Sequence, residues 1–190
     1  MRKKELAVNL LRGFTLVELL VVLLMISIIG GIAFGATKRG GEVLALDRAA
    51  HKVAQDARRA SQMALRGEPF ACPVGNMVGY GIYFNDATPG CYLIYAECDN
   101  ASFYDGLDCE GAGAGLDKPI EIIVLEQGVR IGGVLPLSSG EVLFIPPKPR
   151  LQINGNEDPS ASIKIVLSLA SDSSERKTII IRQKGAIEIQ

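Results

Sequence analysis

The chain has 190 residues, the size of one ordinary domain, and its 48% hydrophobic and 22% charged residues exclude a wholly disordered protein. The formal net charge of -1 conceals a polarity, since residues 1–13 carry a net charge of +3 and the remaining residues carry -4. A mildly acidic body argues against a nucleic-acid partner, whereas a basic head before an apolar run is typical of membrane insertion with the head on the cytoplasmic side.

Two segments come first in chain order: a basic leader at residues 1–13 and an apolar helix at residues 14–36. The 19 residues from Leu19 to Thr37 include no charged side chain. At about 1.5 Å per residue, a helix of that length spans about 28 Å, nearly the thickness of a bilayer core. We therefore predict a transmembrane helix, and the glycines between Gly30 and Gly41 predict a bend or a break behind it.

A second, amphipathic helical segment is predicted for residues 37–69. Apolar residues recur at spacings of three and four from Val43 to Ala64, which is the period of one helix face. This stripe is thin and rich in alanine, so another element of the fold can approach it closely. Gly67 and Pro69 are expected to end the helix.

From residue 70 onward, short runs of β-branched and aromatic residues alternate with turn residues, which predicts a β-rich domain. Asn85–Gly90 is expected to form a hairpin turn, and Asp99–Lys118 a long loop. We predict an α+β fold: a long N-terminal helix, half membrane-spanning and half amphipathic, packed on an antiparallel β-rich domain at residues 70–190. The predicted strands are Val78–Phe84, Cys91–Ala96, Ile120–Leu125, Glu141–Ile145, Ile163–Leu169, Thr178–Arg182 and Ile187–Ile189.

The four cysteines, Cys72, Cys91, Cys98 and Cys109, lie downstream of the apolar run, in the part of the chain expected to be exported. An even number there favours two disulfides, formed in an oxidising compartment, over free thiols or an all-cysteine metal site. If Cys91 and Cys98 flank one extended strand, they lie about 20 Å apart and out of disulfide reach. Two pairings remain open: Cys72–Cys91 with Cys98–Cys109, or Cys72–Cys98 with Cys91–Cys109.

Glu18 stands inside the apolar segment. A carboxylate at the centre of a membrane helix costs roughly 2.5 kcal/mol or more on insertion scales. An intramembrane charge therefore indicates a functional role and requires a compensating partner. The apolar run contains no basic residue that would supply one.

The sequence Gly13-Phe14-Thr15-Leu16-Val17-Glu18-Leu19-Leu20, with the apolar run behind it, resembles the class III signal of type IV prepilins and pseudopilins. In that family, prepilin peptidase cuts after the glycine and methylates the new N-terminus. The resemblance implies cleavage between Gly13 and Phe14, N-methylation of Phe14, and roles in assembly for Thr15 and Glu18. It also implies a single-pass protein of the bacterial inner membrane, with an extracytoplasmic C-terminal domain, that is built into a filament. The implied partners are other pilin or pseudopilin subunits, prepilin peptidase, the inner-membrane assembly platform and membrane lipid.

The charge of Glu18 fits this resemblance. Cleavage creates an ammonium group at Phe14, and the Glu18 carboxylate of a neighbouring subunit can pair with it, so that correct assembly neutralises both charges. Two other interpretations of the N-terminus are an ordinary secretory signal, cut after Ala33-Phe34-Gly35, and an uncleaved signal anchor.

The remainder of the chain resembles, more loosely, the GspH/FimT-type group of minor pseudopilins and minor pilins. This resemblance rests on Ala49–Arg66, Gly140–Pro146 and Lys177–Ile189. It implies a minor structural subunit of a type IV pilus or type II secretion filament, ahead of a major pilin or a DNA-binding competence pilin. The tail Gly185–Gln190 lacks the arginines that follow the glycine in some DNA-binding members, which argues against DNA uptake.

The chain has one histidine, no triad pattern and no convincing metal motif, so we predict a non-enzymatic protein without a cofactor. An acid-rich loop offers Asp99, Asp105 and Asp108 as weak candidates for calcium ligands. Their spacing matches no EF-hand, and a solvated loop is the favoured interpretation.

Overall fold

The structure is a computed structural model that describes residues 15–73, 75–99, 103–111, 113, 115–147 and 150–190; within residues 33–39 it describes the backbone alone. The leader and the predicted cleavage residues, Gly13 and Phe14, lie outside the described residues. The chain divides into two compact units, Met1–Gly40 and Gly41–Gln190. The fold is α+β, as predicted, with an N-terminal helix and C-terminal antiparallel sheets.

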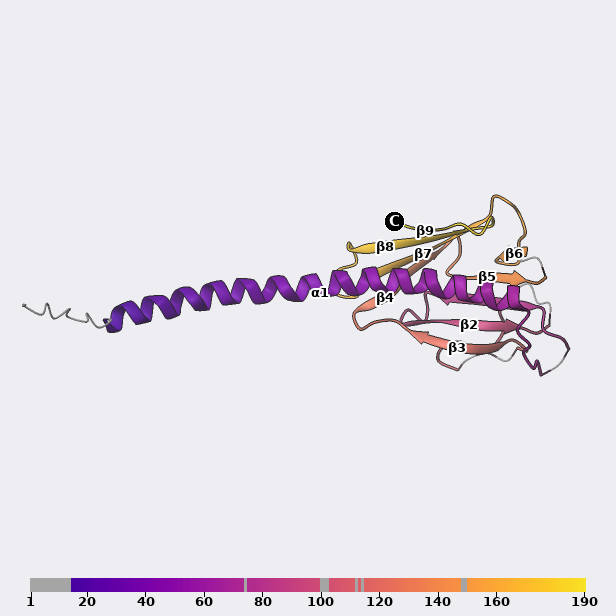
Figure 1. The fold of residues 1–190 in the computed structure, drawn as a ribbon, viewed down its shortest axis with the longest axis horizontal. Helices are drawn as coiled ribbons and strands as arrows, with labels where there is room; N and C mark the ends of the chain where they lie inside the picture. The colour runs from indigo at the N-terminus through magenta and orange to yellow at the C-terminus, as the bar shows by residue number, and fades with distance from the viewer. Residues whose placement is uncertain (1–14, 74, 100–102, 112, 114, 148–149) are drawn as a thin grey trace, which may run out of the picture. The chain divides into compact units, whose positions relative to one another are not determined.

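Helix α1 runs from Leu16 to Arg66 without a break, through the glycines that predicted one (Figure 1). The difference has a physical reason. Glycine weakens a helix by about 1 kcal/mol per site, but unlike proline it keeps its N–H and so leaves every backbone hydrogen bond in place.

The C-terminus of α1 is closed by Gly67, as the sequence predicted. Gly67 has a φ of 60°, in the left-handed region that favours glycine. Its N–H donates to the carbonyl of Ala64 at 3.1 Å, and the N–H of Glu68 donates to the carbonyl of Met63 at 3.3 Å. This pair of bonds is a Schellman cap, which satisfies carbonyls that the last turn leaves without partners.

The described residues of the second unit form nine strands in two antiparallel sheets (Figure 1). One sheet has the order β3-β2-β1-β5-β6 and the other has the order β4-β7-β8-β9. The strands are β1 (Gly79–Asn85), β2 (Cys91–Glu97), β3 (Lys118–Val124), β4 (Val129–Leu135), β5 (Ser139–Ile145), β6 (Arg150–Ile153), β7 (Ser162–Leu169), β8 (Arg176–Arg182) and β9 (Ile187–Ile189). Strands β1 and β2 pair as the predicted hairpin, with Gly79 opposite Glu97.

Strands β4 and β6 were not among the predicted strands. Strand β4 contains Gly132 and Gly133, which have no side chains and so interrupt the alternation of apolar and polar residues. The register of β4 with β7 also shifts between Ile131 and Gly133. Strand β6 has four residues, too few to show an alternation. Both depend on pairing with a partner strand.

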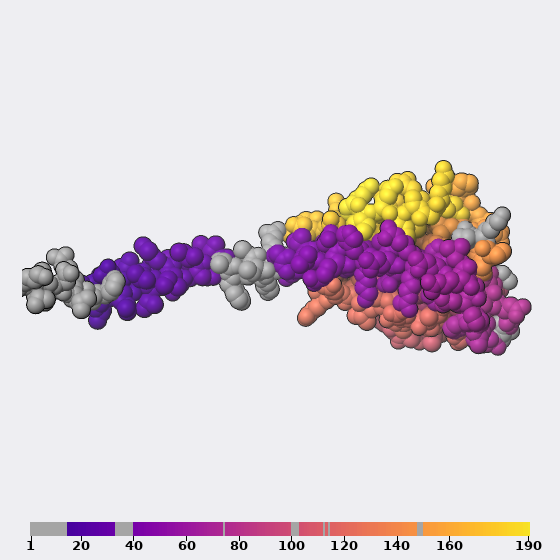
Figure 2. All heavy atoms as spheres, viewed as in Figure 1, coloured from indigo at the N-terminus to yellow at the C-terminus, as the bar shows by residue number. Residues whose placement is uncertain are grey.

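The core of the second unit lies between α1 and both sheets. Tyr80 and Phe84 of β1, and Ile163 and Ile165 of β7, belong to the same buried cluster as the helix. In Figure 2 this half of α1, in purple, lies between the C-terminal strands, in yellow, and the strands drawn in salmon. Alanine side chains are short, so the helix can approach both sheets closely. The buried residues among the described side chains of α1 are Ala45, Leu46, Ala49, Ala50, Val53, Ala54, Ala57, Ala60 and Ala64.

Polar contacts join the flanks of α1 to the first sheet. Arg48 makes two contacts with the carboxylate of Glu126, at 3.1 and 2.7 Å. The Tyr92 hydroxyl donates to Asp56 at 2.6 Å. Exposed ion pairs contribute about 0–1 kcal/mol each, so these contacts orient the helix while the alanine stripe supplies most of the stability.

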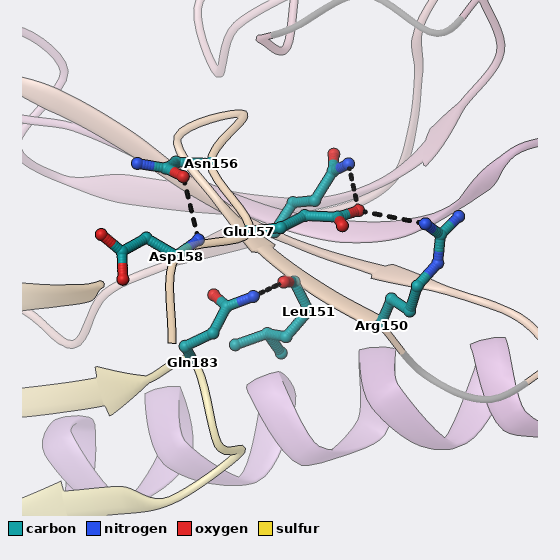
Figure 3. A network of polar contacts seen from close by, with 7 residues as sticks. Arg150, Leu151, Asn156, Glu157, Asp158 and Gln183 are labelled. Atoms are coloured by element: carbon teal, nitrogen blue, oxygen red, sulfur yellow. Dashed lines mark hydrogen bonds and ion pairs between the residues drawn. The ribbon is translucent and has the colours of Figure 1, made fainter. Parts of the chain in front are cut away.

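Side-chain contacts join β6 to the turn that follows it and to the turn between β8 and β9 (Figure 3). Glu157 accepts a hydrogen bond from Gln152 at 3.0 Å and lies 3.4 Å from Arg150. Gln183, in the turn after β8, donates to the backbone carbonyl of Leu151. Local contacts of Glu157 and one tertiary contact of Gln183 therefore support the shortest strand of the first sheet.

Gly81→Ala is expected to lower the free energy of unfolding by about 1–3 kcal/mol, because the added methyl group would overlap the ring of Tyr95 on β2. That ring is fully buried and its hydroxyl donates to Glu141 at 2.8 Å, so it has little room to retreat. Chemical denaturation measures the loss. Gly133→Ala is the control, since its added Cβ meets nothing within 4 Å, and equal losses in the two variants would contradict the explanation.

Candidate functional site

The first described residues form a helix cap. Thr15 directly precedes α1, and its Oγ1 accepts a hydrogen bond from the N–H of Glu18 at 3.3 Å. The spacing Thr-x-x-Glu is that of a capping box, in which the threonine side chain satisfies an N–H that the helix cannot. A carboxylate in the first turn also interacts favourably with the helix dipole. Thr15 and Glu18 therefore have a local role in starting the helix.

The first turns of α1 expose apolar side chains on every side. Their exposed fractions range from 44% at Val21 to 79% at Leu16. The hydroxyl of Ser27 donates to the carbonyl of Leu23 at 2.8 Å, so the helix itself provides a partner for this polar group. A helix that is apolar all round needs a cover that excludes water. The exposed residues are Leu16, Val17, Leu19, Leu20, Val21, Val22, Leu23, Leu24, Met25, Ile26, Ile28, Ile29 and Ile32.

Among the described residues, no helix has the length and apolarity required to cross a membrane. The transmembrane segment expected at residues 14–36 therefore stays a prediction.

A cluster of acids lies where β2 ends and β3 begins. Glu97 is the last residue of β2, Asp99 follows it by two residues, and Asp117 directly precedes β3. Antiparallel pairing of these strands brings the three together, and one carboxylate oxygen of each lies within 4.8 Å of the others. Glu97, Asp99 and Asp117 are called the acidic cluster below.

Glu97 is the least compensated member of the acidic cluster. The residue is fully buried, and neither of its carboxylate oxygens has a hydrogen-bond donor among the described residues. Burial, followed by the neighbouring carboxyl groups of Asp117 and Asp99, raises the pKa of Glu97 to about 8. Burial also raises the pKa of Asp117, although the backbone N–H of Cys98 donates to that carboxylate at 2.9 Å and opposes the effect.

A second buried acid, Glu141 on β5, shows how this domain otherwise accommodates a carboxylate. Its Oε2 accepts hydrogen bonds from the hydroxyl of Tyr95 at 2.8 Å and from the backbone N–H of Tyr104 at 2.7 Å. Burial raises the pKa of Glu141, while these two donors lower it. Neither oxygen of Glu97 has a donor of this kind at hydrogen-bond distance, and the backbone of Asp99 is the one group that acts to lower the pKa of Glu97. The contrast marks the acidic cluster as unusual among the described residues of this domain.

One of the two disulfides adjoins the acidic cluster, and the other ties its loop to the opposite end of β2. The structure joins Cys72 to Cys98 and Cys91 to Cys109, which is one of the two pairings that the sequence left open. Cys98 stands between Glu97 and Asp99, so its disulfide limits the movement of both neighbours.

The glycine-rich stretch before β3, expected to be part of a long loop, is closely packed at two of its described positions. A Cβ at Gly115 would overlap the carboxylate of Asp105, and one at Gly113 would overlap the carbonyl of Gly106. The disulfides and this packing give the loop a defined shape beside the cluster.

The three residues predicted as calcium candidates differ in their distance from the acidic cluster. Asp99 belongs to the acidic cluster. Asp105 lies beside it, since its N–H donates to Asp117 at 3.3 Å and its carboxylate accepts from the N–H of Asp117 at 3.3 Å. The carboxylate of Asp108 accepts from the N–H of Glu110 at 2.9 Å within its own turn. The sequence analysis did not identify Glu97 and Asp117 as candidate ligands. Their positions, at the end of β2 and directly before its partner β3, would have indicated that they lie close together.

Disulfide mapping is expected to find Cys72 joined to Cys98 and Cys91 joined to Cys109 in protein from an oxidising compartment. Replacing both Cys72 and Cys98 by serine should lower the free energy of unfolding by about 3 kcal/mol, because their bridge closes a loop of 26 residues. Peptide mapping without reductant, followed by denaturant titration, makes both measurements. A peptide that joins Cys72 to Cys91 would show the pairing to be wrong.

The raised pKa of Glu97 predicts a loss of stability as the pH rises. Its pKa of about 8 in the folded protein lies above the ordinary value of 4.5, so the folded chain holds a proton that the unfolded chain releases. The stability that Glu97 contributes is fully present below its ordinary pKa of 4.5. It is lost as the pH rises through about 8, the pKa of Glu97 in the folded protein. Melting temperatures in a chelating buffer, from about pH 5 to about pH 9, should show the decline.

Glu97→Gln should flatten this decline, because the amide does not titrate. Glu110→Gln, which removes an exposed acid from the neighbouring loop, should leave it unchanged. An undiminished pH dependence in the Glu97 variant would assign the effect to other groups.

Comparison with known proteins bears on the N-terminal segment. Residues 11–34 match the prokaryotic N-terminal methylation motif. Comparisons with curated proteins and with solved structures gave no match. The motif supports a type IV pilin-like family and indicates a subunit of a pilus or secretion filament, which suggests assembly with other pilin subunits and processing by prepilin peptidase.

Proposed function

We propose that this protein is a minor, GspH/FimT-like structural subunit of a type IV pilus or a type II secretion filament, and not an enzyme. Prepilin peptidase cuts it between Gly13 and Phe14, methylates Phe14, and leaves residues 14–36 to pack in the filament core. The proposal rests on one observation. The methylation motif at residues 11–34 coincides with the apolar start of α1, and Glu18 is the acid in the first turn of that helix.

The exposed apolar side chains at the start of α1 support assembly through this segment. They surround the helix, so a single neighbour covers only part of them, whereas a membrane or a bundle of like helices covers all. Before assembly the cover would be membrane lipid, with the basic leader on the cytoplasmic side and the β-rich domain outside the cytoplasm. After assembly it would be the helices of other subunits, because a repeated contact that does not close generates a helical filament.

The role proposed for Glu18 is to select the register of assembly. An unpaired carboxylate among apolar helices is costly, and the new ammonium group at Phe14 of a neighbouring subunit compensates it. Correct packing is then the arrangement that neutralises both charges. The capping contact with Thr15 uses the Glu18 backbone N–H and leaves the carboxylate available for this pairing.

The pairing of basic residues supports a structural role over DNA binding. Arg182 on β8 lies 3.1 Å from the carboxylate of Glu188 on β9, and Lys177 lies 3.4 Å from Asp47 on α1. Phosphate contacts require basic side chains that are free to face the nucleic acid. Two of the basic residues near the C-terminus are instead engaged with acids of the same chain.

Substitutions at Glu18 separate charge pairing from helix capping. Glu18→Gln keeps a residue that suits a capping box but removes the charge, so we expect cleavage at Gly13 to proceed and incorporation into filaments to fall at least about tenfold. Glu18→Ala should behave in the same way, and Glu18→Asp, which keeps the charge, should retain part of the incorporation. The N-terminal mass of the processed chain measures cleavage and methylation at Phe14, and immunoblots of sheared filaments measure incorporation.

Glu42→Gln is the matched control, since it makes the same change on the same helix beyond the apolar stretch, and it should incorporate normally. Normal incorporation of Glu18→Gln would contradict the charge pairing. A mature chain that begins at Ala36 or at Met1 would contradict the assignment to the pilin class.

A further inference from the structure

We propose that the acidic cluster of Glu97, Asp99 and Asp117 binds a divalent cation, calcium by its chemistry, in the extracytoplasmic domain. This site lies in the β-rich unit and does not depend on how the N-terminal helix assembles.

The principal observation is an uncompensated buried carboxylate. Glu97 is fully buried, and neither of its oxygens has a hydrogen-bond donor in the part of the chain that the structure describes. Its carboxylate faces those of Asp99 and Asp117, with an oxygen from each residue within 4.8 Å. Burial of a carboxylate without donors or a counter-charge is strongly unfavourable, so the arrangement calls for a positive charge among the three groups.

The charges around Glu97 have the same sign as its own. The side chains gathered with it are those of Asp99 and Asp117, both acidic, with carboxylate oxygens within 4.8 Å of one another. The carboxylate of a further acid, Asp105, lies beside Asp117 and accepts a hydrogen bond from its backbone N–H at 3.3 Å. None of the ion pairs made by the described residues supplies a positive charge to Glu97, which leaves a cation or a proton as the compensating charge.

The donor set indicates which cation fits. The cluster offers only carboxylate oxygens, which are the ligands of hard cations such as calcium and magnesium. The four cysteines are all in disulfides, and the one histidine, His51, lies exposed on α1, so the soft and imidazole ligands preferred by zinc and copper are absent from this site. Three acids drawn from a strand end, a loop and a strand start give an irregular shell, which calcium tolerates and magnesium does not.

The cluster is held in place before a ligand arrives. The backbone N–H groups of Cys98 and Asp105 donate to the carboxylate of Asp117, at 2.9 and 3.3 Å. The Cys72–Cys98 disulfide fixes the chain between Glu97 and Asp99. Asp99 is half-buried and Asp105 is exposed, so water can reach one side of the cluster and complete the shell of a bound ion.

Calcium titration of the full chain in detergent, after treatment with a chelator, tests the proposal. The melting temperature should rise by roughly 3–6 °C when free calcium is about tenfold above its Kd. Isothermal titration with calcium chloride should give a Kd on the order of 10⁻⁴–10⁻³ M, the range of exported modules. Magnesium chloride at the same concentration should give a much smaller shift.

Glu97→Gln should abolish the calcium-dependent shift. In chelator at neutral pH it should melt at or above the temperature of the unsubstituted chain, because a neutral amide replaces an uncompensated acid. Asp99→Asn, at the half-buried position, tests the site with less risk to folding and should weaken calcium binding by about tenfold. Glu110→Gln is the control and should keep the full shift.

The opposite results would overturn the proposal. If calcium leaves the melting temperature of the unsubstituted chain unchanged and gives no binding heat, the compensating charge is a proton on Glu97. A full calcium shift in both the Glu97 and the Asp99 variants would place any calcium site elsewhere. Each of these results leaves the proposed filament function untouched, because none of the variants alters the N-terminal segment.

Discussion

The close packing of an alanine stripe against two sheets is the contact on which the rest of the second unit depends. Between Gly41 and Arg66, seven of the nine buried positions on α1 are alanines, and the helix shares one buried cluster with strands of both sheets. Because each sheet buries part of its inner face against this helix, neither would be complete without it. The small side chains are the cause: a stripe of larger residues would hold the helix away from one sheet or the other.

This constraint gives the two halves of α1 opposite relationships with their surroundings. In the second half the apolar residues form a narrow face, and the sheets cover it. In the first half they surround the helix, and nothing in the described residues covers them. The backbone helix α1 runs from Leu16 to Arg66, so one secondary-structure element contains both kinds of segment.

The parts that sequence could predict are those set by local patterns. The helical period, the Gly67 cap and seven strands follow from spacing and turn residues, and the methylation motif is a contiguous stretch. Strands β4 and β6 were not predicted. In β4, Gly132 and Gly133 interrupt the alternation of apolar and polar residues, and β6 has only four residues, too few to show one. The choice between disulfide pairings and the acidic cluster both depend on contacts made by strand pairing. Glu97 and Asp117 are twenty residues apart in sequence, and no local signal says that their carboxylates meet.

Three acids in this chain illustrate different ways in which a carboxylate can be compensated. Glu141 receives two hydrogen bonds from within the domain. Glu18 starts a helix through its backbone N–H and, in the proposed assembly, pairs with a charge that exists only after cleavage. Glu97 has neither donors nor an opposite charge in the described chain, which leaves a proton or a cation. A proton would satisfy Glu97 alone, whereas a cation would satisfy Asp99 and Asp117 at the same time, and the convergence of all three on one point favours the cation.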